Sequence, residues 1–268
     1  YSNPNQLVLG NKIDITIEEK ATGELMAGAG VGTDGTSVQF SVSENNWLGR
    51  GINLQSLVNL SQEKVNGNIA ITNPNYNFSG NSVTAGLNVS STDRSSTSGY
   101  QSSSSGFDIG TKFEQYENLY FSPSFSTSFE SLQTTSIATD NLKKQKGDYF
   151  DAYFNYGLDY DMRNQRYQAT DGSRTYFAQQ LPLISENSEI INTFEVSKYK
   201  TLVSDMVGKI SFYSQTANSL TDDDVRISKR LYVPYKKLRG FQKGKVGPKD
   251  NQSYIGGNYV SSLNMSAT

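Results

Sequence analysis

Apolar and polar residues alternate over long stretches of this chain. In the longest run, one set of alternate positions is mainly apolar or aromatic and the other set carries carboxylates. The first set is Phe150, Ala152, Phe154, Tyr156, Leu158, Tyr160 and Met162, and the second is Asp151, Tyr153, Asn155, Gly157, Asp159, Asp161 and Arg163. A period of two predicts a β-strand with one apolar face. At about 3.3 Å per residue and a tilt near 45°, such a strand crosses a hydrocarbon layer. The alternative is an outer strand of a soluble sandwich, where strands are usually about half as long.

Shorter runs with the same period predict a series of further strands. They cover residues 12–19, 25–33, 37–43, 52–60, 64–72, 83–90, 107–113, 120–129, 175–183, 190–199 and 203–213. The connections at 45–51, 73–80, 115–119 and 199–202 are short, while those at 91–105, 131–147 and 214–252 are long. Residues 91–105 are almost all Ser, Thr, Gly and Gln, which predicts a mobile loop. Short turns on one side and long loops on the other are typical of outer-membrane barrels.

The strand predicted at 25–33 is rich in glycine. Gly28, Gly30 and Gly32 occupy one face of it, and glycine weakens the interior of a strand. The stretch 30–35 also matches the dinucleotide-binding pattern G-x-G-x-x-G, which requires a following helix to present its amides to pyrophosphate. Residues 37–43 alternate strictly instead, so Asp34-Gly35 indicates a hairpin turn and the nucleotide interpretation is disfavoured.

Composition supports a membrane barrel over a soluble domain. Of the 268 residues only 35% are hydrophobic, yet the chain has 17 Tyr, 13 Phe and 23 Gly. A soluble core of this size requires more Leu, Ile and Val, whereas a barrel needs apolar residues only at alternate positions. No apolar run approaches the roughly 20 residues of a membrane helix, so any span is expected to be β. The fold class predicted is therefore an all-β, antiparallel transmembrane β-barrel.

Charge and residue types exclude several functions. A net charge of −2 argues against binding of nucleic-acid phosphates. The absence of Cys and His removes thiolate and imidazole ligands together with the commonest general base, so we expect no enzyme, no metal and no cofactor. The chain opens at Tyr1 without Met or a signal segment, and we expect it to be a piece of a longer precursor.

One arginine stands between apolar residues in the long polar segment near the end. Leu238-Arg239-Gly240-Phe241 is poorly suited to a solvated loop, because Arg239 stays charged at any ordinary pH. If Leu238 and Phe241 bring this segment under cover, the guanidinium needs carboxylates or carbonyls there. The tetrapeptide therefore predicts a tucked-in loop.

Four sequence motifs together resemble the BamA branch of the outer-membrane-protein assembly factor superfamily. Asn45-Asn46-Trp47-Leu48-Gly49 is similar to its first periplasmic turn, and 72–76 to its second. Thr170-Asp171-Gly172-Ser173-Arg174 is similar to the turn leading out of its eighth strand. Leu238-Arg239-Gly240-Phe241, followed by 247–249 and 256–258, resembles its sixth external loop with the (V/I)RGF motif, although Leu238 replaces the usual Val or Ile.

The resemblance implies a domain organisation. Residues 1–21 would be the end of the last POTRA domain, the periplasmic module that precedes the barrel. Residues 22–268 would be the transmembrane barrel, with about twelve of about sixteen strands. The chain would be truncated before its last strands, which carry the carboxylates that hold the motif arginine in relatives. Asp159 or Asp161 are the candidates to replace them.

The resemblance also implies a function: folding and insertion of β-barrel proteins into the bacterial outer membrane. The partners would be unfolded barrel clients, outer-membrane lipid, and accessory lipoproteins reached through POTRA domains, with no nucleic acid. Gly28, Gly30 and Gly32 would form a weak lateral gate, and Arg239 would fix the loop inside the barrel. Asn46, Trp47, Gly49, Asp171, Gly172 and Arg174 would mark the periplasmic turns. The alternative is a two-partner-secretion transport pore of the same superfamily.

Overall fold

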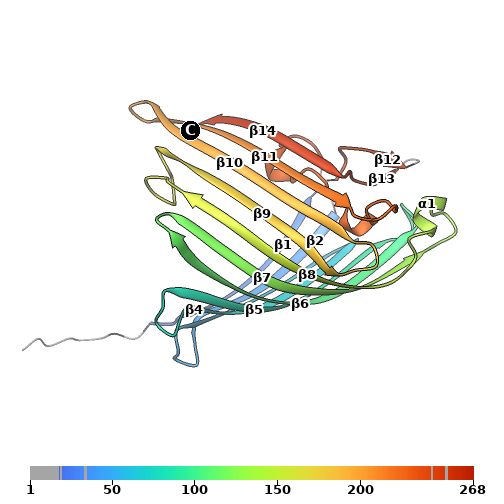
Figure 1. The fold of residues 1–268 in the computed structure, drawn as a ribbon, viewed down its shortest axis with the longest axis horizontal. Coiled ribbons are helices and arrows are strands. Elements are labelled where there is room, and N and C mark those ends of the chain that lie inside the picture. The colour runs from blue at the N-terminus through green and yellow to red at the C-terminus, as the bar shows by residue number, and fades with distance from the viewer. Residues whose placement is uncertain (1–17, 19, 33–34, 243, 251–252) are drawn as a thin grey trace, which may run out of the picture.

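The fold is one large antiparallel sheet with short segments of other structure at one end (Figure 1). A computed structural model describes residues 18, 20–32, 35–242, 244–250 and 253–268. The sheet contains β1 (Gly23–Gly32), β2 (Gly35–Trp47), β3 (Ile52–Ser61), β4 (Lys64–Tyr76), β5 (Asn81–Arg94), β6 (Tyr100–Tyr116), β7 (Leu119–Thr134), β8 (Gly147–Asp161), β9 (Gly172–Ile184), β10 (Glu189–Val203), β11 (Met206–Ser219) and β14 (Tyr259–Ala267). The other elements are α1 (Asp140–Lys143), two 3₁₀ turns, Ile227–Lys229 and Tyr235–Lys237, and the hairpin β12 (Lys249–Asp250) with β13 (Ser253–Tyr254).

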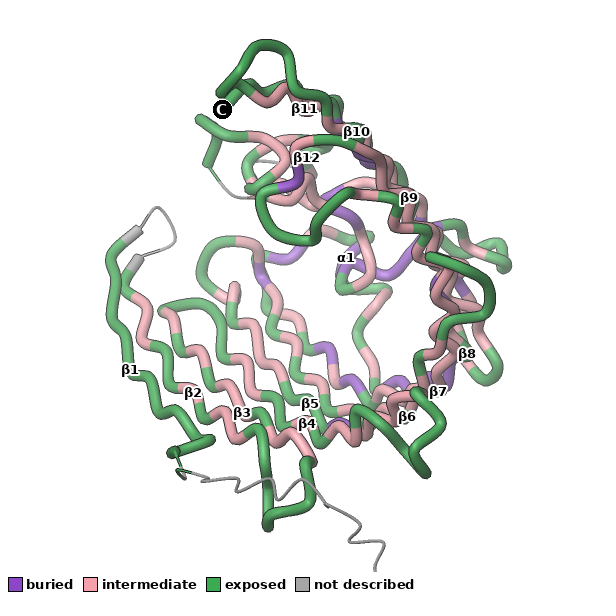
Figure 2. The backbone as a smooth tube through the Cα atoms, turned by 90° about the vertical axis from the view of Figure 1, so that its left-hand side faces the viewer, coloured by how far each residue is buried: buried purple, intermediate pink, exposed green. Residues whose placement is uncertain are grey.

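Each strand of the sheet pairs with the next one along the chain, and β14 pairs with β11. Within the described residues, these twelve strands form an open sheet whose end strands are β1 and β14. The sheet curls strongly, and α1 and β12 lie on its concave side (Figure 2). The prediction of an antiparallel barrel with about twelve strands is confirmed, with the barrel not closed.

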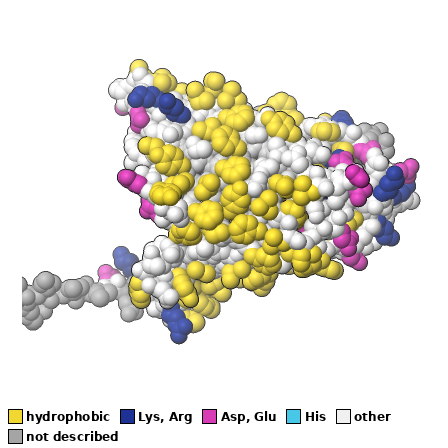
Figure 3. Space-filling view, in the orientation of Figure 1, with side chains coloured by type: hydrophobic (Ala, Val, Ile, Leu, Met, Phe, Trp, Pro, Cys, Tyr) yellow, Lys and Arg dark blue, Asp and Glu magenta, His cyan; other side chains and the backbone are white. Residues whose placement is uncertain are grey.

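The convex face of the sheet is apolar across its middle. Figure 3 shows hydrophobic side chains gathered over the centre of this face, with charged side chains at the two ends of the strands. Exposed apolar side chains come from β2 to β8 and from β10, β11 and β14: Val42, Val58, Ile69, Leu87, Ile109, Phe125, Phe154, Phe194, Ile210 and Leu263. Several are direct cross-strand neighbours, such as Ile109 with Phe125 and Phe125 with Phe154. Exposed apolar residues in such a continuous band are what a lipid-facing surface requires.

Strand β8 shows both faces of this arrangement. Phe150 and Phe154 are 47% and 37% exposed on the convex side, whereas Asp151 and Tyr153 are completely buried on the concave side. The predicted separation into an apolar and a carboxylate-bearing face is therefore confirmed. The carboxylates face inward, where other polar side chains can satisfy them.

The loops differ in length between the two ends of the strands. Turns 48–51, 77–80, 117–118 and 204–205 lie at one end, the short-turn end, together with the longer connection 162–171. Loops 135–146 and 220–258 lie at the opposite end, the long-loop end. Of the predicted long loops, 91–105 is wrong, because β5 runs to Arg94 and β6 begins at Tyr100. Serine is polar enough for a loop, but here both strands complete backbone ladders with their neighbours.

The buried apolar residues form two small clusters near the long-loop end, where the loops meet the concave face. One contains Leu132, Ala138, Leu142, Tyr149 and Ile227. The other contains Tyr213, Ala217, Val225, Leu231 and Val260. Both clusters include residues of the 220–258 segment, so this segment is part of the packed interior.

Some predictions concern residues outside the described part of the chain. The strand predicted at 12–19 lies almost wholly there, and so do residues 33–34 of the first hairpin. The pairing of Gly32 with Gly35 nevertheless shows a hairpin in place of the strand-turn-helix of a nucleotide site. In the described residues, no helix has the length and apolar character needed to span a membrane.

Candidate functional site

The most deeply buried part of the long loop is Val225-Arg226-Ile227. The exposed fractions of these residues are 2%, 0% and 7%. Val225 packs in the cluster on β11 and β14, whereas Ile227 packs in the cluster beside α1. Alternate side chains of this tripeptide thus reach two clusters, and Arg226 is held between them. We call residues 220–258 the inner loop.

Arg226 is bound by carboxylates from two neighbouring strands. Its Nη2 lies 2.7 Å from Oδ2 of Asp151 on β8, and its Nη1 lies 3.3 Å from Oε2 of Glu130 on β7. The guanidinium also stacks over the ring of Tyr149, 4.1 Å from its centroid. All these groups are buried, so the ion pairs are little screened by water. The arrangement fixes the inner loop to the sheet at a single, geometrically specific point.

Other polar groups complete the coordination of the two carboxylates. Glu130 accepts hydrogen bonds from the hydroxyl groups of Ser102, at 2.8 Å, and Ser228, at 2.8 Å. Asp151 accepts one from the hydroxyl of Ser185 at 2.7 Å. We call Arg226, Glu130, Asp151 and these serines the arginine knot. With Arg226 present, both carboxylates have hydrogen-bond and ion-pair partners, so the free-energy cost of burying them is small. Without Arg226 that cost would be large.

Neighbouring carboxylates stabilise the charged form of Arg226. Burial alone would lower the pKa of the Arg226 guanidinium, but the negative charges of Asp151 and Glu130 raise it above its ordinary value. A third buried carboxylate, Glu189 on β10, accepts a hydrogen bond from the Tyr153 hydroxyl at 2.7 Å. Its second oxygen, Oε2, has no hydrogen-bond partner within the described part of the chain, and neither has Nε of Arg226. The interior at this end is therefore acidic and receives basic side chains from the loop.

Further basic residues of the inner loop follow the same pattern. Lys229 lies over the ring of Tyr153 at 5.0 Å, with its Nζ 3.9 Å from Asp151. Lys237 forms an ion pair with Glu195 of β10 and lies 5.2 Å from the ring centroid of Tyr213. Each cation therefore meets both a carboxylate and an aromatic ring of the concave face. These contacts hold the loop along β8, β10 and β11.

The inner loop also closes on itself. Leu231 and Gly257 form a β-bridge, and the hydroxyl of Tyr232 donates to the carbonyl of Tyr254 at 3.1 Å. Burial raises the pKa of that Tyr232 hydroxyl above its ordinary value. The two branches of the loop are thus joined before the chain enters β14.

The predicted loop motif lies elsewhere in the inner loop. Arg239, Gly240 and Phe241 are exposed, and Leu238 is half-buried. Among the described residues, no partner is seen for the Arg239 guanidinium, so the predicted burial of Arg239 is wrong for this structure. Gly240 has a φ of +85°, a conformation that favours glycine. The role of the tetrapeptide as a docking motif stays a prediction.

Asp159 and Asp161 are also not the partners of Arg239. Asp159 accepts two hydrogen bonds from Arg174, at 2.7 and 2.9 Å, and Asp161 binds Arg163 at 2.7 Å. Both carboxylates lie at the short-turn end of β8, the opposite end from the inner loop. The expectation that one of them replaces the missing partners of Arg239 is therefore wrong, because both lie at the opposite end of the strands from the inner loop.

The first turn motif ends β2 at the short-turn end. Asn46 accepts a hydrogen bond from the backbone N–H of Gly51 at 2.6 Å, which closes the turn. Gly49 follows with a φ of +70°, and Trp47 is 41% exposed at the end of the strand. Exposure of the indole at this height suits the boundary between lipid and water.

The turn motif at residues 170–174 leads into β9. Gly172 has a φ of +100°, and a Cβ there would lie 2.2 Å from the carbonyl oxygen of Met162, so only glycine fits. Asp171 binds Nζ of Lys200 at 2.9 Å, and this contact lowers the pKa of its carboxyl. Arg174 binds Asp159. The structure therefore gives all three residues local roles in connecting β8, β9 and β10.

The glycines of β1 lie at the free end of the sheet. Gly28 pairs with Gln39 and Gly30 with Ser37, so the glycine face is on the polar, concave side. A Cβ at Gly28 would meet no atom within 4 Å, and one at Gly30 would meet only the Ser37 hydroxyl at 3.9 Å. Packing against described neighbours does not require glycine at either position.

Sequence reasoning missed the arginine knot, although the signal was present. Val225-Arg226-Ile227 is an arginine between two β-branched apolar residues, the same pattern that drew attention to Arg239. The preceding run Asp222-Asp223-Asp224 is typical of a solvated loop, and it therefore obscures this signal. Within the described residues, no group of three or more acidic, His or Cys side chains is arranged to hold a metal ion.

Comparison with known proteins agrees with this architecture. Residues 46–267 match the Omp85 superfamily domain. The fold is similar to the crystal structure of BamA from Haemophilus ducreyi lacking POTRA domains 1–3, with a TM-score of 0.76 and 20% sequence identity. The match covers 92% of this chain and 53% of that structure, so the chain spans about half the length of the solved relative. The chain therefore belongs to the Omp85 superfamily, and its barrel lies in the bacterial outer membrane.

Proposed function

We propose that this protein folds and inserts β-barrel proteins into the outer membrane through a weak lateral seam at β1. Its substrates are unfolded barrel clients, its other partners are outer-membrane lipid and accessory lipoproteins that bind through POTRA domains, and it acts without enzymatic catalysis. The free energy comes from folding of the client, so neither a nucleotide nor a cofactor is needed.

The observation that carries this proposal is the composition of β1. Gly28 and Gly30 have open space where a side chain would stand, so close packing does not explain the glycines. Their effect is to weaken the strand, since glycine has the largest conformational entropy to lose on pairing. A weakly paired strand with free N–H and C=O groups along one edge can template an incoming client strand.

The inner loop supports this function by keeping the rest of the barrel rigid. The arginine knot joins the loop to β7 and β8, and Lys237 joins it to β10. These strands lie far from β1 in the order of the sheet. The barrel wall opposite the seam is therefore braced, and opening is confined to the seam.

Reconstitution tests the proposal directly. The full-length protein is placed in liposomes, an unfolded outer-membrane barrel is added, and client folding is followed by its heat-modifiable migration and protease resistance. We expect folding to be several times faster than in protein-free liposomes of the same lipid. Equal rates in the two preparations would contradict an assembly function.

A secretion pore of the same superfamily is the second candidate, and the inner loop is the observation that favours it. A loop of this length, packed against the concave face, is suited to act as a removable plug. The same liposomes distinguish the two functions. Appearance of a secreted substrate inside the liposomes without client folding favours the pore. Client folding in the bilayer favours assembly.

A further inference from the structure

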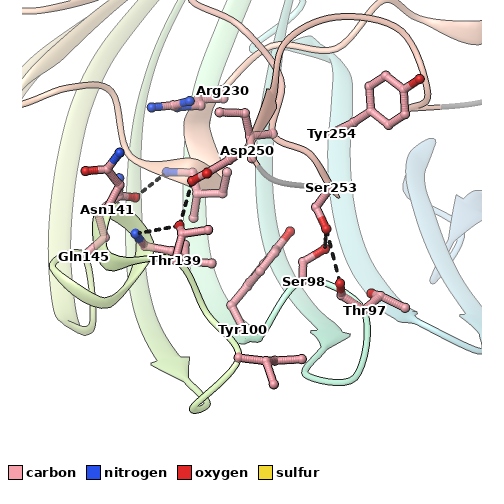
Figure 4. A pocket seen from close by; sticks show the side chains of 14 residues that line it. Thr97, Ser98, Tyr100, Thr139, Asn141, Gln145, Arg230, Asp250, Ser253 and Tyr254 are labelled. Atoms are coloured by element: carbon pink, nitrogen blue, oxygen red, sulfur yellow. Dashed lines mark hydrogen bonds between the residues drawn. The ribbon is translucent and has the colours of Figure 1, made fainter.

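A cavity of about 310 Å³ lies among three loops at the long-loop end, away from the seam. The loops are the β5–β6 turn at 95–99, the segment 135–146 that contains α1, and the inner loop (Figure 4). Leu142 and Ile227, which belong to the apolar cluster beside α1, form part of its lining. In outer-membrane barrels the longer loops face the outside of the cell, so this cavity is on the external side.

Hydroxyl and amide groups line the cavity. The Thr139 hydroxyl donates to Oδ2 of Asp250 at 2.6 Å, which leaves Oδ1 of Asp250 without a partner among the described residues. The Ser98 hydroxyl donates to that of Ser253 at 3.0 Å. The side-chain amide of Asn141 lines the cavity and has no hydrogen-bond partner in the described ranges. Figure 4 shows these groups arranged around the cavity. Acceptors and donors therefore face the same space.

The charges around the cavity disfavour an anionic ligand. Arg230 is the cationic residue of its lining, but its guanidinium is bound to Asp224 and to the carbonyl of Val225, the latter at 3.1 Å. Asp250 is the acidic residue of the lining. Among the described residues that line the cavity, a phosphate or carboxylate would meet Asp250 with no cation other than Arg230, which is already paired, to offset the repulsion.

We propose that this cavity binds a neutral saccharide unit. A sugar offers hydroxyl groups that both donate and accept, which suits Asp250, Asn141 and the serine and threonine hydroxyls. Its C–H faces suit the apolar side chains and the ring of Tyr100 in the same lining. The volume is at the lower end of the roughly 300–1,000 Å³ range of ligand sites, which limits the bound part to about one sugar unit.

Two sources can supply such a unit on the external face: a free saccharide, or a sugar in the glycan of an outer-leaflet lipid. The chemistry recognised is the same in both cases. The site is independent of the seam at β1, so it goes beyond the assembly function and is tested by a different measurement.

The test uses the full-length protein in detergent and saturation-transfer NMR. The probes are glucose, galactose, N-acetylglucosamine, and a delipidated lipopolysaccharide core oligosaccharide in dephosphorylated and phosphorylated forms. Asn141→Leu and Asp250→Asn are the variants. Asn141→Leu breaks no hydrogen bond seen among the described residues. Asp250→Asn keeps a side-chain oxygen that can accept the hydrogen bond from Thr139. Asp148→Asn is the control, because Asp148 is an exposed carboxylate of the same region that does not line the cavity.

We expect saturation transfer to at least one neutral probe, with affinity reduced about tenfold in each variant and unchanged in the control. Transfer to the dephosphorylated core but not to the monosaccharides assigns the site to a lipid glycan, and the reverse assigns it to free sugars. The proposal is overturned if no neutral probe binds, if only the phosphorylated core binds, or if both variants bind as the wild type does.

Discussion

At the scale of single residues, the knot around Arg226 is a cluster of charged side chains that is almost completely buried. Two carboxylates, Glu130 and Asp151, are buried with one guanidinium between them. Removing the Arg226 cation leaves Glu130 without an ion-pair partner among the described residues and leaves Asp151 with only Lys229, 3.9 Å away, while both carboxylates are buried. The cost of such a change greatly exceeds that of losing a surface ion pair.

We therefore expect Arg226→Met to destabilise the protein by about 3–5 kcal/mol. The measurement is urea unfolding of the protein in detergent, followed by heat-modifiable migration. The double variant Arg226→Met with Asp151→Asn should lose less than the sum of the two single variants, because one uncompensated charge is also removed. Arg50→Met, at an exposed arginine in the turn after β2, is the matched control and should change stability by less than about 0.5 kcal/mol. Equal loss in Arg226→Met and Arg50→Met would contradict the importance of the knot.

Backbone conformation gives a second expectation at this scale. Gly172→Ala must place a Cβ 2.2 Å from the Met162 carbonyl oxygen at a φ of +100°, so we expect a loss of at least about 1–3 kcal/mol. Gly49→Ala, at a φ of +70° with no atom within 4 Å of the new Cβ, should cost only about 1–2 kcal/mol. The unfolding midpoints of the two variants provide the comparison. A Gly49→Ala variant that is the less stable of the two would contradict the clash at Gly172.

At the scale of elements, the period-two pattern predicts most strands but not their ends. The alternation in β8 is strict, and both its strand and its orientation follow from sequence. The prediction of a loop at residues 91–105 is wrong because Ser and Thr are equally suited to a loop and to the solvated face of a strand. What decides between them is the pairing of β6 with β5 and β7, and contacts such as Ser90 with Ser104 at 3.1 Å.

The docking of the inner loop could not be predicted from sequence for a different reason. Arg226 and Arg239 have similar apolar neighbours, and only the three-dimensional position of Glu130 and Asp151 selects Arg226. Those carboxylates come from two other strands, β7 and β8. Local sequence shows that an arginine needs partners, but it does not show which arginine reaches them.

Strand β1 provides a prediction at the element scale. Gly28→Thr and Gly30→Thr add β-branched, polar side chains to a face that has room for them. Each is worth up to about 1 kcal/mol of strand pairing, so together they should slow client folding in liposomes roughly tenfold if opening of the seam limits the rate. Ala70→Thr in β4, which is paired on both sides, is the control and should leave the rate unchanged. An unchanged rate in the double β1 variant would contradict the weak seam.

At the scale of the whole molecule, the inner loop connects the long-loop end with the concave face of the sheet by direct contacts. Its cations contact carboxylates and aromatic rings on β7, β8, β10 and β11, and its apolar residues complete both buried clusters. The loop is thus held by many contacts of different kinds. Those at the knot are buried, whereas the Lys237–Glu195 pair is partly exposed and therefore more sensitive to salt.

This distribution of contacts predicts how the protein conducts ions. With the loop in place, the full-length protein should show small conductance in a planar bilayer. Lys237→Met combined with Arg226→Met removes the basic anchors on both sides of the loop, so we expect larger and more frequent openings, while heat-modifiable migration shows that the barrel is still folded. Lys236→Met, at an exposed neighbour of Lys237, is the control and should behave as the wild type. Raising the salt concentration should promote openings in the Arg226→Met variant more than in the wild type, because the partly exposed Lys237–Glu195 pair, which salt screens, then carries a larger share of the charged contacts beside Lys229–Asp151. A folded double variant with wild-type conductance would mean that apolar packing of Val225 and Ile227, and not the charged contacts, keeps the loop inside the barrel.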